Sequence, residues 1–177
     1  MASAVLCAAA CGKKQAAGPS GPASSPASAA SAAPAASTAL AGLVTDKALV
    51  DGHIVEVSHS KWDGGQTSDL FDEDRGTLAR TEKANPAILE FRLPEPRPIA
   101  GIAITMGGTD YAVTVTVHPA DGGPAKTYAK EFRQMKPDPT LEVPFDTGAT
   151  KIASLRVEIK DVNGGDGHIH IRTVKLL

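Results

Sequence analysis

The sequence predicts an all-β fold, an antiparallel jelly-roll β-sandwich of about eight strands, preceded by a disordered tail rich in Ala, Ser and Pro. Two observations carry this prediction. Apolar and polar residues alternate in short runs, which is the pattern of a half-buried strand. Glycine pairs separate these runs at hairpin spacing, and no stretch of 12 or more residues keeps a clean helical period.

Apolar residues two positions apart mark each expected strand. In chain order they are Val55 and Val57; Ala87, Leu89, Phe91 and Leu93; Ile102 and Ile104; Val113, Val115 and Val117; Leu141 and Val143; Leu155, Val157 and Ile159; Ile169 and Ile171. Turns are expected at Asp63-Gly64-Gly65, Gly107-Gly108, Asp121-Gly122-Gly123 and Asn163-Gly164-Gly165. The markers all fall after residue 43, so residues 43–177 are expected to form one domain.

Residues 12–42 are expected to be a disordered linker. From Gln15 to Ala39, 11 of 25 residues are Ala, 6 are Ser, 4 are Pro and 2 are Gly, with no charged or aromatic residue. Such a segment buries too little apolar surface to offset the backbone entropy of ordering, about 1–2 kcal/mol per residue. Its prolines also interrupt every run that would nucleate an alanine-rich helix.

Residues 1–11 resemble the end of a bacterial lipoprotein signal, with Ala8-Ala9-Ala10-Cys11 as the lipobox. The resemblance implies that Cys11 is lipidated after cleavage. The segment lacks the basic start and the long apolar core of a complete signal, so either Met1 lies inside a longer signal or the match is accidental. The expected location is therefore the bacterial cell envelope, with membrane attachment through lipid, since no later run reaches a spanning length.

Charge and motifs exclude several function classes. Residues 43–177 carry 16 basic and 20 acidic side chains, so no nucleic-acid partner is expected. The sequence contains no nucleophile elbow, phosphate-binding loop or dinucleotide fingerprint. A carboxylate pair for glycoside hydrolysis needs a cleft that a small sandwich seldom provides. We therefore expect a protein that is not an enzyme.

The stretch from Leu70 to Leu93, LFDEDRGTLARTEKANPAILEFRL, contains an acidic turn, a threonine, an Asn-Pro step and an alternating strand in that order. It resembles the discoidin or coagulation-factor type C domains of the galactose-binding-like sandwiches. The resemblance extends over roughly residues 43–177, because Lys151 to Ile159 and His168 to Leu176 read like the last two strands of that family. It implies a jelly-roll sandwich.

The same resemblance implies a structural calcium held by Asp72, Asp74 and Thr77 and completed by a Glu on the last strand. In this sequence Thr173 stands at the position of that Glu, and Glu73 replaces the glycine between the two aspartates. Compared with the family pattern, a calcium ion at this turn would lack one anionic ligand and the flexible glycine between the two aspartates. No cofactor is expected, with a weak calcium site at this turn as the alternative.

Without calcium, the acidic turn has a purely structural interpretation. Asp72 and Asp74 are then expected to accept hydrogen bonds from turn amides, and Asp74 to pair with Arg75 or Arg80.

Trp62 and Arg80 are the candidate ligand-binding residues. Trp62 is the only tryptophan and is expected in a loop after the first strand, where its ring would stack on a sugar or close the mouth of the sandwich as packing. Arg80 would donate paired hydrogen bonds to hydroxyls or a sugar carboxylate. The resemblance does not extend to galactose specificity, because Leu78-Ala79 stands where the family has an aromatic residue.

His168 and His170 flank Ile169, so on a strand both imidazoles would point the same way, as in many metal sites. No third ligand is evident in the sequence, and surface histidines are the favoured interpretation.

The leading functional hypothesis is a tethered, non-catalytic module of the cell envelope that binds a carbohydrate or another envelope component. The alternative is a protein-protein interaction module or a structural accessory lipoprotein with no small-molecule ligand, whose partner is another envelope protein.

Overall fold

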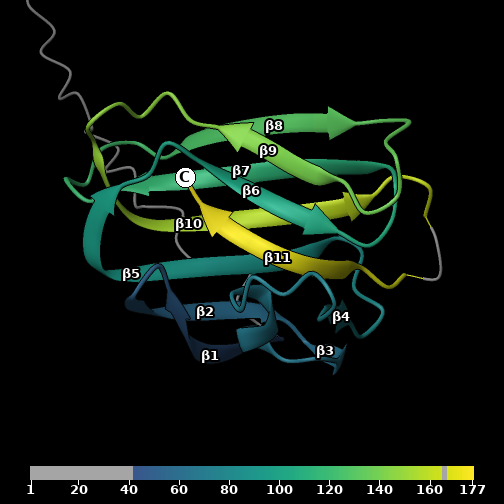
Figure 1. Cartoon of the computed structure of the whole chain (residues 1–177). Coiled ribbons are helices and arrows are strands. Elements are labelled where there is room, and N and C mark those ends of the chain that lie inside the picture. The colour runs from purple at the N-terminus through teal and green to yellow at the C-terminus, as the bar shows by residue number, and fades with distance from the viewer. Residues whose placement is uncertain (1–41, 165–166) are drawn as a thin grey trace, which may run out of the picture. The chain divides into compact units, whose positions relative to one another are not determined.

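The computed structural model describes residues 42–164 and 167–177, and the fold is that of these residues (Figure 1). The expected lipoprotein signal at 1–11 with Cys11, and residues 12–41 of the expected linker, lie outside the described residues.

The described residues form two antiparallel sheets that enclose one hydrophobic core. The first sheet has six strands in the order β1 (Leu43–Val50), β2 (His53–Ser60), β5 (Ala87–Pro98), β10 (Lys151–Asp161), β7 (Tyr111–Pro119) and β8 (Lys126–Phe132). The second has five strands in the order β3 (Trp62–Gly64), β4 (Ala79–Thr81), β11 (His170–Leu176), β6 (Gly101–Met106) and β9 (Thr140–Pro144). The expected all-β antiparallel sandwich is confirmed.

The expected number of about eight strands is too low, because the described residues form eleven. Trp62, expected in a loop, starts β3. β3 and β4 have three residues each, too few for a visible alternation. β1 and β8 are edge strands whose side chains are mostly exposed, so they need few apolar residues.

The core lies between the inner faces of the sheets. All the apolar residues that marked the expected strands are at most 5% exposed. β5 shows the pattern most clearly: Ala87, Leu89, Phe91 and Leu93 point inward, while Arg92 is exposed on the outer face. The alternation in the sequence is therefore the alternation between core and solvent.

Two local features position the candidate site. β11 lies between β4 and β6, so it joins the short β3–β4 hairpin to the rest of the sheet (Figure 1). A 3₁₀ turn, η1 (Thr67–Leu70), links β3 to the acidic turn and contacts β11. Within the described residues, helical structure never reaches the length and apolar character needed to cross a membrane.

Candidate functional site

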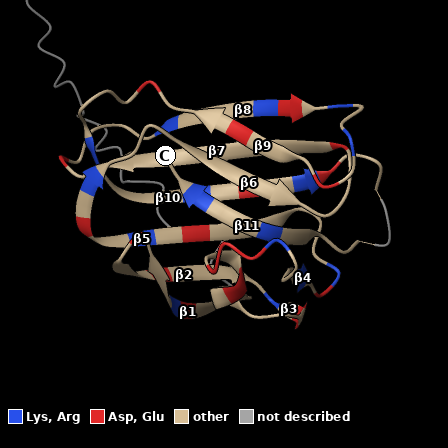
Figure 2. Cartoon of the chain, viewed as in Figure 1, with Lys and Arg blue, Asp and Glu red and all other residues tan. Residues whose placement is uncertain are grey.

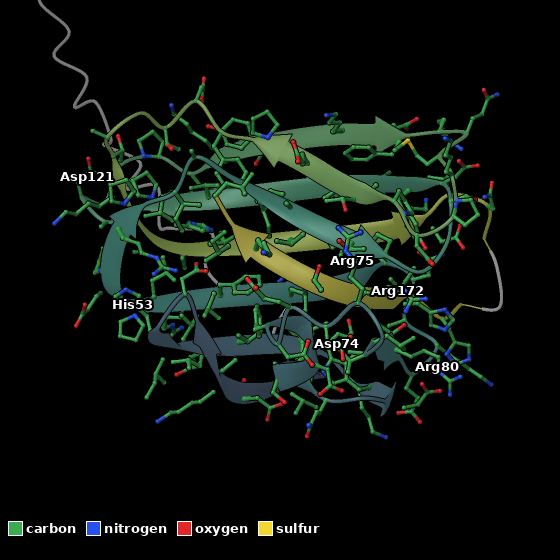
Figure 3. The ribbon with its side chains drawn as sticks, viewed as in Figure 1. His53, Asp74, Arg75, Arg80, Asp121 and Arg172 are labelled. Carbon is green, nitrogen blue, oxygen red and sulfur yellow. The ribbon has the colours of Figure 1, made fainter. Side chains whose placement is uncertain are left out.

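Three polar side chains meet where the β3–β4 hairpin approaches the start of β11. Arg80 donates from Nε to Asp63 Oδ1 at 2.7 Å, and His168 Nδ1 lies 3.5 Å from Asp63 Oδ2. We call Asp63, Arg80 and His168 the polar cluster. Their side chains keep 26%, 43% and 16% of their surface exposed, so a ligand can reach them. Figure 3 shows Arg80 near the end of the sandwich that carries β3 and β4.

Buried backbone contacts hold the cluster in place. Thr81 donates from its amide to Ile169 O at 3.0 Å, and the Ile169 amide donates to Thr81 Oγ1 at 2.8 Å. His168 Nδ1 lies 2.6 Å from Thr81 O. Because a carbonyl oxygen only accepts, His168 carries a proton on Nδ1. The imidazole is thus oriented by β4 itself.

The neighbours of Asp63 keep its carboxyl group ionised. The hydrogen bond from Arg80 lowers the pKa of Asp63 below its usual value, and the charges of Arg80 and His168 act in the same direction. Asp63 is therefore a carboxylate at neutral pH, and the cluster offers an acceptor between two donor groups. Sugar hydroxyls both donate and accept hydrogen bonds, so this arrangement suits them.

The hairpin separates the two ligand-binding residues expected from the sequence. Trp62 lies opposite Thr81, which points into the core, whereas Arg80 lies opposite Gly64 across a register shift. Residues directly opposite each other share a face of a sheet. Trp62 therefore faces inward and Arg80 outward, and the structure does not bring them together on one surface.

Trp62 is half-buried and packs against the core. Its ring stacks on His59 of the other sheet, with centroids 4.6 Å apart and planes 9° apart. Its Nε1 donates to Thr67 Oγ1 at 3.1 Å. These contacts are those of the packing role considered for Trp62, and they attach the hairpin to β2.

The acidic turn has the internal hydrogen bonds expected of a structural turn. Asp72 Oδ1 accepts from the Asp74 amide at 2.9 Å, and Asp74 Oδ1 accepts from the Gly76 amide at 2.7 Å. Thr77 Oγ1 lies 3.0 Å from Asp72 Oδ2. The expected use of both aspartates on turn amides is confirmed. Arg80, considered as a partner of Asp74, pairs with Asp63.

Basic positions of β11, coloured blue in Figure 2, contact the acidic turn where the resemblance implies a carboxylate. Lys175 Nζ pairs with Glu73 Oε1 at 2.9 Å, and Arg172 donates from NH1 to Arg75 O at 2.9 Å. Thr173 is buried and lines a small cavity with Glu73. The described residues hold no group of three or more acidic, His or Cys side chains arranged for a metal ion. Lys175 therefore stands beside the turn and pairs with Glu73, while Asp72 and Asp74 are bonded within the turn itself.

We expect the melting temperature in millimolar calcium to lie within about 2 °C of that in chelator, because a site that binds little ligand adds little stability by mass action. Differential scanning fluorimetry measures this. Thr173→Glu is the control, since it adds the missing carboxylate beside the turn and should make the melt respond to calcium. A calcium-induced rise of about 10 °C in the wild type, lost in Asp72→Ala, would contradict the expectation.

The two histidines differ in their surroundings. Ile169 is buried between them, but β11 begins at His170, so His168 precedes the strand. His168 belongs to the polar cluster, whereas His170 lies opposite Arg80 in the β4–β11 pairing. Asp63 is the member of the cluster that sequence reasoning missed; its adjacency to Trp62 was the signal available.

Comparison with solved structures identifies the fold. Neither protein-family models nor curated proteins give a match to this chain. The module CpGH89CBM32-4 from Clostridium perfringens is 18% identical, with a TM-score of 0.51, covering 68% of this chain and 93% of that one. The family 32 carbohydrate-binding module of NanJ from C. perfringens, in complex with galactose, is 19% identical, with a TM-score of 0.51 and coverages of 69% and 92%.

The family 32 module of AlyQ, in complex with 4,5-unsaturated mannuronic acid, is 14% identical, with a TM-score of 0.53 and coverages of 68% and 92%. At these identities the likeness establishes the fold alone. Family 32 modules have the galactose-binding-domain-like fold, so the fold implied by the discoidin resemblance is confirmed.

Proposed function

We propose that this chain is a non-catalytic carbohydrate-binding module whose recognition site is the polar cluster. The observation that carries the proposal is the convergence of a guanidinium and a carboxylate of the β3–β4 hairpin with an imidazole from the segment before β11. The fold supports it, since NanJ and AlyQ modules of the same fold are in complex with saccharides.

The cluster has the groups for binding and lacks those for hydrolysis. Glycoside hydrolysis uses two carboxyl groups on either side of the scissile bond. The cluster has one carboxylate, and Arg80 is bound to it. A neutral or acidic sugar would be held by hydroxyl contacts without bond cleavage.

The experiment is a glycan panel that includes galactose-terminated, uronate-containing and cell-wall saccharides, probed with the full chain. We expect saturable binding to at least one class. Failure to bind any saccharide, in protein shown to be folded by its melting curve, would contradict the proposal.

We further propose that the module is tethered to the cell envelope through lipid on Cys11. The support is the sequence alone, an Ala-Ala-Ala-Cys run followed by an uncharged segment rich in Ala, Ser and Pro. Protein expressed in its native host should partition into detergent, and Cys11→Ser should move it to the aqueous phase. Identical partitioning of both proteins would rule out this anchor.

A surface groove favours a second candidate function, binding to another envelope protein. Leu49 and Ile54 lie opposite each other on β1 and β2, and each is 64% exposed. Ile54 also lines a groove of about 480 Å³ with Leu93 and Pro94. Exposed apolar residues beside a groove are typical of protein-binding surfaces. A crosslinking pulldown that captures a partner in wild type and loses it in Ile54→Lys would favour this function.

A further inference from the structure

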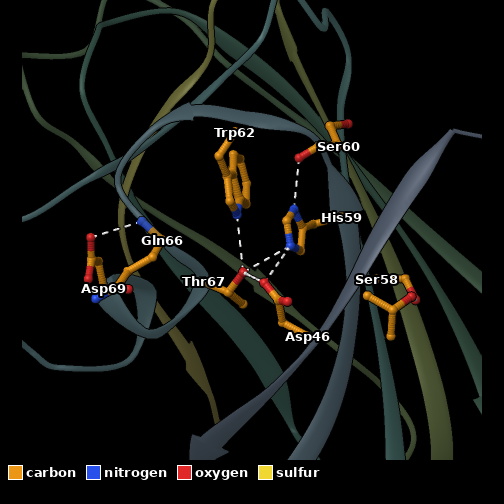
Figure 4. Close-up of polar contacts among 9 residues, drawn as sticks. Asp46, Ser58, His59, Ser60, Trp62, Gln66, Thr67 and Asp69 are labelled. Atoms are coloured by element: carbon orange, nitrogen blue, oxygen red, sulfur yellow. Dashed lines mark hydrogen bonds and ion pairs between the residues drawn. The ribbon is translucent and has the colours of Figure 1, made fainter.

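A hydrogen-bond network centred on the buried His59 ring connects β1 and β2 of one sheet with η1 and with Trp62 of β3 in the other (Figure 4). His59 on β2 is 1% exposed, and its Nε2 lies 3.1 Å from Asp46 Oδ2 of β1 and 2.9 Å from Thr67 Oγ1 of η1. Thr67 Oγ1 lies 2.6 Å from the same carboxylate oxygen and accepts from Trp62 Nε1 at 3.1 Å. His59 Nδ1 lies 2.8 Å from Ser60 O. Three polar atoms, one from each of β1, β2 and η1, thus form a closed triangle.

Counting protons assigns the charge of His59. Nδ1 faces a carbonyl oxygen, which only accepts, so Nδ1 carries a proton. The 2.6 Å contact between Thr67 and Asp46 requires the single hydroxyl proton of Thr67. His59 Nε2 then faces two oxygens that have no proton left to give. The network is complete only when Nε2 is also protonated. The ring is then an imidazolium stacked on the Trp62 indole, a favourable cation-π arrangement.

Loss of that proton breaks the network. With a neutral ring, the Thr67 proton can serve His59 or Asp46 but not both, and one short contact is left without a hydrogen. Asp46, whose side chain is 47% exposed, then takes a hydrogen bond from water in place of the one from the ring. Because Trp62 binds both His59 and Thr67, the β3 strand loses part of its attachment to β2.

The surroundings of His59 leave Asp46 as its charged partner among the described residues. The hydrogen bond from Thr67, and then that from His59, lower the pKa of Asp46. On η1, Asp69 accepts from the Gln66 amide at 3.0 Å. Beside β3 and β4, Lys61 pairs with Glu82 at 2.6 Å. On β5, the residue opposite His59 is the apolar Leu89.

We propose that His59 and Asp46 are positioning residues that hold the β3–β4 hairpin in its binding geometry while His59 is protonated. Trp62 is bound to this network, and the next residue, Asp63, belongs to the polar cluster. The part that concerns ligand binding rests on the proposed function. The positioning itself does not, and it is measured without ligand.

The single tryptophan makes the network visible by fluorescence. An imidazolium against an indole quenches its emission more than a neutral imidazole does. Raising the pH until the ring loses its proton should therefore increase Trp62 emission in a single transition. NMR titration of the His59 ring in the wild type should give the same midpoint without any substitution.

Three variants test the assignment. Asp46→Asn keeps the side-chain shape and removes the charge, while His59→Gln keeps polar atoms but removes the titrating ring, so the fluorescence titration should shift in the first and disappear in the second. His53→Gln is the matched control, because His53 lies on the same strand, is half-exposed and lies 3.9 Å from Glu95. It should keep the wild-type titration. With a bound saccharide, His59→Gln should weaken affinity roughly tenfold, the effect of losing one charge-assisted hydrogen bond.

The outcomes separate the two proposals. A flat wild-type profile, or a profile unchanged in His59→Gln, overturns the positioning role even if saccharides bind. A titration that depends on His59 but no saccharide binding supports the positioning role and contradicts the proposed function.

Discussion

Replacing Gly65 with alanine should destabilise the protein by about 2–5 kcal/mol, the sum of left-handed backbone strain and a steric clash. Gly65 has φ of +73°, and a Cβ there would lie 2.0 Å from Leu78 O and 3.0 Å from Ala79 Cα. Both neighbours are backbone atoms, so no side-chain rotation relieves the clash. Since β4 begins at Ala79, the hairpin must shift and take Arg80 with it.

Gly52→Ala is the matched control. Gly52 has φ of +79° in the turn between β1 and β2, but nothing lies within 4 Å of the position that a Cβ would take there. It should cost only the backbone term, about 1–2 kcal/mol. Urea unfolding measures both variants. Equal losses of stability in the two variants would mean that the backbone around Leu78 relaxes without a measurable loss of folding free energy, and would contradict the prediction.

Arg80→Ala should weaken saccharide binding by about tenfold or more, because hydrogen bonds to charged groups contribute about 1.5–3 kcal/mol. Arg80→Lys keeps the charge but loses the planar donor fork and should recover part of the affinity. Arg133→Ala is the matched control, since Arg133 makes a similar exposed pair with Glu131 at 3.3 Å on another part of the surface. Isothermal titration calorimetry with a saccharide from the panel measures all three.

Saccharide binding should also weaken at low pH, through protonation of Asp63. Its pKa is lowered by Arg80, so the carboxylate persists at neutral pH and its contribution is lost only as the pH falls through that lowered value. Affinity that is unchanged in folded Arg80→Ala would move the binding site away from the polar cluster.

Local patterns predicted the parts of the fold that depend on neighbours in the chain. Leu89 and Phe91 alternate with exposed residues because a strand places every second side chain in the core, and this period is visible in the sequence. The amide contacts of Asp72 and Asp74 were predictable for the same reason, since each spans two residues. The inward orientation of Trp62 could not be predicted in this way, because it depends on which residue of β4 lies opposite Trp62.

The candidate site depends on pairings between distant segments. Asp63 and Arg80 are 17 residues apart, and His168 is 87 residues from the Thr81 carbonyl that orients it. Asp46 lies on an edge strand with little alternation, so nothing in the sequence linked it to His59 or Thr67. Register and bulges decide these contacts, and a single sequence does not reveal register.

The central place of β11 in its sheet has a consequence for the order of assembly. The β3–β4 and β6–β9 pairs are joined through β11, the last of the described strands. Contacts between such distant segments carry a larger loop-closure entropy than a short hairpin does. His168 reaches Arg80 and Asp63 only when this strand is inserted, so ligand recognition by the polar cluster would also report that the sandwich is closed.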